Sequence, residues 1–218
     1  MSTLSLRLRA ETQDLHTIAE RSGVMRPLLR GTLPASEYAW LLRNLYEIYA
    51  ALESGMTAHA TDPVLAPFAH PGLRRMSSLH RDLDAIGGSQ WAMMNVTPTT
   101  RRYVARLVEL SDRDPQLLLA HAYVRYLGDL SGGQHIARIV RRALPQFDKA
   151  VEFYSFPELG DLDAFKTAVR DGMDTLPLSN DAVTGMVAEA RHGFEMHAML
   201  FNELAADAST RGPMSGGS

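Results

Sequence analysis

The 218-residue sequence contains no cysteine, which excludes disulfide bonds, thiolate zinc sites and a cysteine nucleophile. Charge of neither sign is in large excess, because 22 basic residues stand against 25 acidic ones, and this balance argues against a nucleic-acid partner. No apolar run approaches the roughly 20 residues of a membrane-spanning helix. The N-terminal residues also hold no apolar segment of signal-peptide length. We therefore expect a cytoplasmic protein that binds neither membranes nor nucleic acid.

Strand-like alternation of apolar and polar residues is absent as well. Apolar residues instead recur at three- and four-residue steps along most of the chain, which predicts an all-α fold in one domain. Glycine, proline and capping signals place the expected helices at residues 5–20, 35–60, 72–86, 98–110, 115–144, 161–173 and 180–206. We assign residues 1–206 to the domain, interpret 145–160 as a loop, and expect residues 207–218 to form a disordered tail.

Three glycines interrupt the helical pattern of residues 115–144, at positions 128, 132 and 133. Each glycine inside a helix costs on the order of 1 kcal/mol relative to alanine, so their presence requires a reason. At about 100° per residue, Gly128 and Gly132 share one side of the helix with Arg125 and Asp129. The opposite side, which we expect to face the core, carries Tyr123, Leu127, Leu130 and Ala137.

A helix side without side chains suits a flat ligand that lies against the backbone. The spacing alone is also compatible with two roles that involve no ligand. The segment Ser131-Gly132-Gly133 could end one helix, with a glycine in the left-handed conformation after the last turn. Alternatively, the glycines could let a neighbouring helix approach closely.

One histidine has the surroundings of a metal ligand. His16 lies four residues before Glu20 on the first expected helix, so the two side chains share a face. A ligating imidazole usually donates its other N–H group to a carboxylate or carbonyl, which this pair could provide; a surface ion pair is the alternative. A carboxylate-bridged di-iron bundle needs two Glu-x-x-His pairs, and the sequence offers one complete match, Glu189 to His192.

Two basic residues form a candidate anion site. Lys166 and Arg170 lie four residues apart on one expected helix, a fork suited to paired carboxylates. Most pairs of this kind face water. Arg9, on the first helix, could join them only if the fold brings the two helices together.

Two segments together are highly specific. Leu15-His-Thr-x-Ala-Glu20, followed by Tyr123-Val-Arg-Tyr-Leu-Gly-Asp-Leu-Ser-Gly-Gly-Gln134, strongly resembles the heme oxygenase family. Leu45-Tyr-x-Ile-Tyr-x-Ala-Leu-Glu53 and Phe165-Lys-x-x-x-Arg170 match the same family. The resemblance covers nearly the whole chain, from about residue 6 to residue 204, in the same order.

The resemblance implies a helical fold in which heme b, both substrate and cofactor, lies between the first helix and a kinked glycine helix. By position, His16 looks like the ligand of the heme iron, and Glu20 looks like the partner of that histidine. Gly128 and Gly132 would place bare backbone over the opposite, distal face of the heme.

The same resemblance implies roles for the neighbouring polar residues. Asp129 would organise water on the distal face, with Arg125 and Tyr49 extending its hydrogen-bond network. Four residues resemble those that hold the heme propionates: Arg9, Tyr123, Lys166 and Arg170. Phe194 is expected to contact the heme.

The implied activity is oxidative cleavage of heme at its α-meso carbon, with O₂ and electrons from a reductase or ferredoxin, to give biliverdin, carbon monoxide and ferrous iron. Iron acquisition and heme turnover are the implied uses, and a monomer is expected. A heme carrier or sensor without activity is the alternative. The basic residues Arg138, Arg141, Arg142 and Lys149 could dock the electron donor or could simply form a solvated helix side.

One segment departs from the family pattern. Between Phe194 and Phe201 the family usually carries apolar residues and an asparagine, whereas this chain has Glu195 and His197 in that interval. His197 could support the site, ligate a metal adventitiously or be a spectator, and we favour the spectator interpretation.

Overall fold

The computed structural model describes residues 3–211, and every regular element among them is a helix or a helical turn. This confirms the all-α prediction. A π turn, η5 (Tyr123–Leu127), joins α6 to α7. The α-helices are α1 (Leu4–Glu20), α2 (Met25–Arg30), α3 (Ala35–Ala58), α4 (Met76–Gly87), α5 (Pro98–Arg113), α6 (Leu118–Ala122), α7 (Gly128–Ala143), α8 (Leu162–Asp174) and α9 (Asn180–Arg211).

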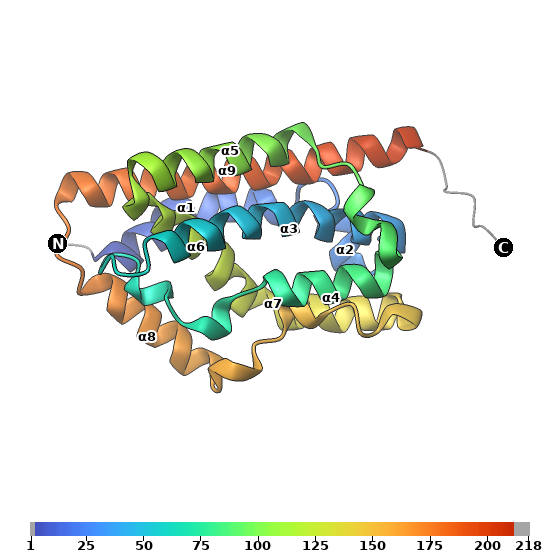
Figure 1. The fold of residues 1–218 in the computed structure, drawn as a ribbon, viewed down its shortest axis with the longest axis horizontal. Coiled ribbons are helices and arrows are strands. Elements are labelled where there is room, and N and C mark those ends of the chain that lie inside the picture. The colour runs from blue at the N-terminus through green and yellow to red at the C-terminus, as the bar shows by residue number, and fades with distance from the viewer. Residues whose placement is uncertain (1–2, 212–218) are drawn as a thin grey trace.

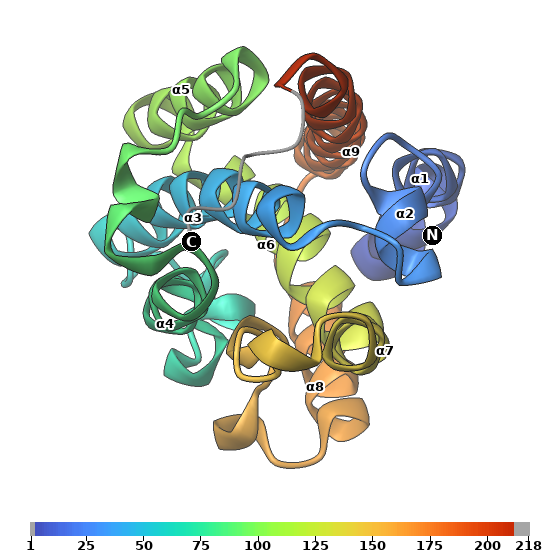
Figure 2. The ribbon, with the colours of Figure 1, turned by 90° about the vertical axis from the view of Figure 1, so that its right-hand side faces the viewer.

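The helices are arranged around α3 and α6. Figure 1 shows α5 and α9 along one side of the bundle, with α4, α7 and α8 on the other. In the end-on view of Figure 2, α1, α4, α5, α7 and α9 surround α3 and α6. The first and last helices are neighbours, because α1 packs along α9, while α3 packs against both α4 and α5.

Helix α3 supplies much of the core because its apolar residues recur at helical spacing. Tyr38, Leu42, Ile48, Tyr49 and Leu52 on this helix have no exposed surface. A stripe of this kind buries one face of the helix along its length, which is how tertiary contacts stabilise a helix that would be marginal in isolation.

Polar side chains cap the starts of two helices, α8 and α9. The Ser179 hydroxyl accepts a hydrogen bond from the Ala182 N–H at 3.1 Å, at the start of α9. The Asp161 carboxylate accepts the N–H groups of Asp163 and Ala164 at 2.9 and 3.1 Å, at the start of α8. Both caps satisfy backbone donors that have no partner within the helix.

The structure differs from the expected helix boundaries in several places, of which four matter most. The six-residue α2 is absent from the expected helices, because it is too short to show a period; Gly31 ends it with φ of 70°. Pro71–Leu73 forms a 3₁₀ turn, so α4 begins at Met76. The expected loop 145–160 contains three 3₁₀ turns: Pro145–Phe147, Glu152–Tyr154 and Pro157–Leu159. Helix α9 continues to Arg211, beyond the expected domain end, and residues 212–218 of the expected tail lie outside the described residues.

The glycine-containing helix does not end at its glycines. Within residues 3–211, the glycines with positive φ are Gly23, Gly31, Gly88 and Gly160. Helix α7 runs without interruption from Gly128 to Ala143. The interpretation that Ser131-Gly132-Gly133 ends a helix is therefore wrong.

Candidate active site

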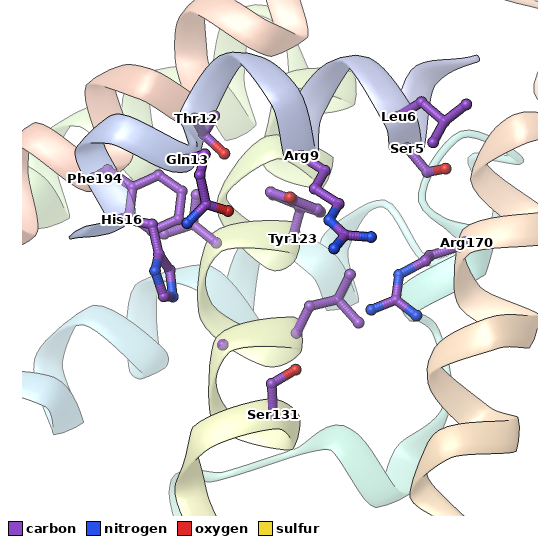
Figure 3. A pocket seen from close by; sticks show the side chains of 13 residues that line it. Ser5, Leu6, Arg9, Thr12, Gln13, His16, Tyr123, Ser131, Arg170 and Phe194 are labelled. Atoms are coloured by element: carbon purple, nitrogen blue, oxygen red, sulfur yellow. The ribbon is translucent and has the colours of Figure 1, made fainter. Parts of the chain in front are cut away.

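A cavity lies between α1 and the continuous helix formed by η5 and α7 (Figure 3). It has two adjoining lobes, an outer lobe of about 340 Å³ and an inner lobe of about 270 Å³. Five residues line both lobes: His16, Val124, Gly128, Ser131 and Phe194. The cavity is therefore one continuous space bounded by α1 on one side and the glycine-containing helix on the other.

The three glycines of this helix serve two different purposes. A Cβ atom added at Gly128 or Gly132 would meet no other atom within 4 Å, so both glycines face open space. A Cβ added at Gly133 would lie 3.1 Å from Cδ1 of Tyr154, so this glycine allows close packing. Close approach of a neighbouring segment therefore accounts for Gly133, and a bare helix face accounts for Gly128 and Gly132.

The π turn changes which side chains share the bare face. In a regular helix Tyr123 and Leu127 point away from Gly128, and the spacing predicts that both face the core. Both line the outer lobe together with Gly128. Leu127 is also buried in the core as expected, whereas Tyr123 is only partly buried. A π turn bonds residue i to i+5, so it holds an extra residue and rotates the preceding segment relative to a regular helix. Leu130 and Ala137, which follow the turn, are buried as expected.

His16 points from α1 into the cavity (Figure 3). Its side chain is 42% exposed, and its Nε2 atom lies 3.8 Å from Oε1 of Glu20, which is beyond hydrogen-bond distance. The ring of Phe194 meets the imidazole edge-on, with centroids 5.7 Å apart. Phe194 thus supports the imidazole from one side, and the ring remains available to a ligand in the cavity.

Asp129 lies at the inner lobe, where it is 8% exposed. Its Oδ1 accepts a hydrogen bond from Nη2 of Arg125 at 3.0 Å, and the Tyr49 hydroxyl donates to Oδ2. The Nε atom of Arg125 donates to the Tyr49 oxygen at 3.3 Å. Burial raises the pKa of the Asp129 carboxyl, although Arg125 and Tyr49 favour its ionised form. The structure therefore brings together the three residues expected to form one network.

The basic residues expected to act together are only partly brought together. Arg9 on α1, Arg170 on α8 and Tyr123 on η5 all line the outer lobe (Figure 3). Lys166 is not part of that lining; its Nζ lies 2.7 Å from Oδ1 of Asp163. Asp163 lies three residues before Lys166 on the same helix, so the i, i+3 spacing could have indicated this pair.

The structure does not support the spectator interpretation of His197. This residue lines the inner lobe, is 2% exposed, and has its Nε2 atom 3.1 Å from Nη1 of Arg125. Glu195, by contrast, stays at the surface, with 53% of its side chain exposed. Sequence reasoning also missed Gln13 and Ser131 as lining residues; Ser131 could have been found from its place one turn after Gly128.

Among residues 3–211, no group of three or more His, Asp or Glu side chains could hold a metal ion. Glu189, from the lone Glu-x-x-His match, is instead bound by Arg106 and His121. A di-iron centre is therefore not formed by the part of the chain that the structure describes. His16 lies in the cavity without two further His, Asp or Glu side chains that could complete a metal site with it.

Residues 2–203 match the family model described as heme oxygenase. The chain belongs to the heme oxygenase family. Heme oxygenase 1 of Synechocystis sp. is 36% identical over 202 residues, which are 92% of this chain and 84% of that protein. The heme oxygenase of Porphyra purpurea is 36% identical over 206 residues, 94% of this chain and 87% of the relative.

Solved structures of heme oxygenases have the same fold. The crystal structure of Synechocystis heme oxygenase-1 in complex with heme superposes with a TM-score of 0.90 and 35% identity, and the match covers 96% of this chain and 95% of that one. The heme oxygenase of Leptospira interrogans gives a TM-score of 0.88 at 33% identity, covering 93% and 100% of the two chains. The family and the fold implied by the sequence motifs are confirmed.

Two further observations concern membrane-spanning helices and the part of the chain that the matches cover. None of the helices in residues 3–211 is both long and apolar enough to cross a membrane. The matches cover 84% and 87% of the two relatives and more than nine-tenths of this chain, and the family model spans residues 2–203, so the cavity described above belongs to the part that the family shares.

Proposed function

We propose that this protein oxidatively cleaves heme b at the α-meso carbon, using O₂ and electrons from a reductase or ferredoxin, to biliverdin, carbon monoxide and ferrous iron. One observation carries the proposal. The bare backbone of Gly128 and Gly132 faces the same cavity as the imidazole of His16, with the buried Asp129 carboxyl at its inner lobe. A carrier would need the ligand and the flat wall, but not the buried carboxyl with its two donors.

The residues of the cavity fit heme. A flat macrocycle needs walls without protruding side chains, and the open space in front of Gly128 and Gly132 provides one. Its iron needs a ligand, for which we assign His16, with Glu20 as the neighbouring carboxylate. Its two propionates need cations, and Arg9 and Arg170 line the outer lobe. We assign the propionates to these two residues and Tyr123, because Asp163 holds Lys166.

When bound, heme would supply the iron that binds O₂ and the carbon that is oxidised. The protein's part is to place that carbon and to deliver protons. Arg9, Arg170 and Tyr123 in the outer lobe would fix the rotation of the ring in its plane, and so the edge that enters the inner lobe. Phe194 would hold the imidazole of His16 in a set orientation, since the two rings are in contact.

Asp129 would hold and release a proton at its carboxyl. Its raised pKa makes this exchange accessible closer to neutral pH than for an exposed aspartate. The Tyr49 hydroxyl donates to Oδ2 and Arg125 to Oδ1, so the carboxyl is held in place at the wall of the inner lobe. Water in that lobe would carry the proton between Asp129 and the reacting edge.

The proposal also includes the location of the protein, its oligomeric state and its electron donor. We propose a cytoplasmic monomer that serves iron acquisition or heme turnover, in keeping with a sequence that has no cysteine. The exposed side chains of Arg138, Arg141, Arg142 and Lys149 offer a basic surface to an acidic electron donor.

Hemin titration followed by ascorbate or a reductase in air tests the function. We expect a sharp Soret band that falls as a biliverdin absorption grows. A Soret band that persists during turnover would favour a carrier or sensor, and failure to bind heme would refute the proposal.

The His16→Ala variant tests the ligand, with His135→Ala as its control, because His135 is exposed on α7 and outside both lobes. We expect His16→Ala to change the ferric heme spectrum and His135→Ala to leave it unchanged. An unaltered spectrum in His16→Ala would point to a different ligand.

A further inference from the structure

His197, a buried histidine of helix α9, contacts Arg125, which in turn binds Asp129. The Nδ1 atom of His197 lies 2.8 Å from the carbonyl oxygen of Gly193, and its Nε2 atom lies 3.1 Å from Nη1 of Arg125. A carbonyl oxygen can only accept a hydrogen bond, so Nδ1 carries the proton and donates. Nε2 is then the unprotonated nitrogen and accepts from the guanidinium. The two contacts together define a neutral imidazole with a single tautomer.

The groups around His197 also favour the neutral form. Arg125 on η5 brings a positive charge directly to the ring. Tyr103 on α5 meets the ring edge-on, with centroids 5.0 Å apart, but its hydroxyl is engaged at 2.9 Å by Nδ1 of His121 on α6. The carboxylates of this cluster contact other residues: Asp129 accepts from Arg125 at 3.0 Å, and Glu189 lies 2.9 Å from Nε2 of His121. Burial, and then Arg125, lower the pKa of His197 well below its ordinary value.

The guanidinium of Arg125 is held in three directions. Its Nη1 donates to His197, its Nη2 to Asp129 and its Nε to Tyr49. A guanidinium is planar, so fixing its outer nitrogen fixes the direction of the other two. Without an acceptor at Nε2, the 9% exposed Arg125 would be left with a buried donor and no partner there.

We propose that His197 is a positioning residue of the site: as a neutral acceptor it fixes the guanidinium of Arg125, and thereby the place of Asp129 in the inner lobe. The role of Asp129 in heme cleavage belongs to the function proposed above, on which the catalytic consequence rests. The orientation of Arg125 is a property of the protein alone. Protonation of His197 in acid would place two cations in contact and release Arg125.

Two variants distinguish the role of His197 as a hydrogen-bond acceptor from its ability to take up a proton. In His197→Gln the side-chain carbonyl can reach the position of Nε2 and accept from Arg125, but it does not titrate. In His197→Leu the acceptor and the titration are both lost, while a buried apolar side chain is retained. The readout is hydrogen exchange of the Arg125 Nε–H group by NMR in the protein without heme, assigned from its loss in Arg125→Lys.

At neutral pH we expect slow exchange in the wild type and in His197→Gln, and exchange about ten-fold faster or more in His197→Leu. This ratio corresponds to the loss of one hydrogen bond to a charged group, about 1.5 kcal/mol. In acid the wild type should lose its protection and His197→Gln should keep it. The wild-type pH series needs no variant, so it tests the proposal even if His197→Leu does not fold.

Equal exchange in all three proteins at neutral pH would overturn the proposal, as would the same acid dependence in the wild type and His197→Gln. In the heme-loaded proteins, biliverdin yield should fall in His197→Leu and be retained in His197→Gln. If Arg125 behaves as expected in the protein without heme but biliverdin does not form in the wild type, the proposed function fails and the positioning role stands.

Discussion

Replacing the glycines of α7 by alanine should separate heme contact from helix packing. A methyl group at Gly128 or Gly132 would meet no atom within 4 Å, and Gly128 has ordinary helical angles of φ −62° and ψ −50°. Alanine in a helix is favoured over glycine by about 1 kcal/mol. For a protein of this size, each substitution should therefore raise the Tm of the heme-free protein by roughly 2–4 °C.

Gly133→Ala should have the opposite effect on stability. The new methyl group would lie 3.1 Å from Cδ1 and 3.3 Å from Cβ of Tyr154, which is itself 4% exposed. Crowding a packed interior in this way costs about 1–3 kcal/mol, which exceeds or cancels the gain in helix propensity. We expect an unchanged or lower Tm. Gly185→Ala, on α9 and with open space around its Cβ, is the control that gains propensity away from the cavity.

Heme affinity should follow a different order from stability. At Gly128 and Gly132 the methyl group occupies the space assigned to the macrocycle, and relieving that overlap should weaken heme binding by about ten-fold or more. Gly133→Ala and Gly185→Ala should bind heme as the wild type does. Thermal unfolding and hemin titration measure the two quantities. If Gly128→Ala and Gly132→Ala gain stability and bind heme as tightly as the wild type, the bare face is not the heme wall.

Three further results are expected. Asp129→Asn should retain heme but form biliverdin about 100-fold more slowly or worse, because the amide cannot supply a proton; an unchanged rate in single turnover would contradict that role. Arg170→Ala should weaken hemin binding in a titration more than Lys166→Ala, because Arg170 lines the cavity and Lys166 is paired with Asp163; equal losses would contradict the assignment. Burial raises the pKa of Asp82 to about 7, so the folded protein keeps a proton that the unfolded chain releases above about pH 4. The free energy of unfolding should therefore fall as pH rises toward 7 by up to about 1.4 kcal/mol per unit, and urea denaturation of Asp82→Asn should show a shallower fall.

The long helices could be predicted from the sequence because their signals are local. The apolar stripe of α3 depends on neighbours within a few positions, and the structure has it as expected. The short α2 could not be found in this way, since six residues do not complete two turns of a period. What the sequence predicts well is therefore where the chain is helical over several turns.

The candidate site was predictable as a set of residues, but not as an arrangement. The family motif identifies Gly128, Gly132 and Gly133 together, and only the position of Tyr154, contributed by a distant segment, separates the third from the other two. Lys166 and Arg170 differ for a local reason, because Asp163 engages Lys166 from three residues earlier on the same helix. The distinction between the glycines depends on a contact between residues far apart in the chain, which helical spacing does not contain.

The π turn explains why helical spacing predicts the pairing of Arg125 with Asp129 correctly but misplaces Tyr123. Arg125 and Asp129 lie on one side of the helix both in the pattern of the sequence and in the structure, where their side chains meet at 3.0 Å. Tyr123, expected in the core, is only partly buried and lines the cavity, and Leu127 lines the cavity while also being buried in the core as expected. On this segment Arg125 meets His197 and Tyr49, while Tyr123 lines the outer lobe together with Arg9 and Arg170. The π turn allows residues of one short segment to line both parts of the cavity, because Tyr123 and Leu127 line the outer lobe and Arg125 lines the inner lobe.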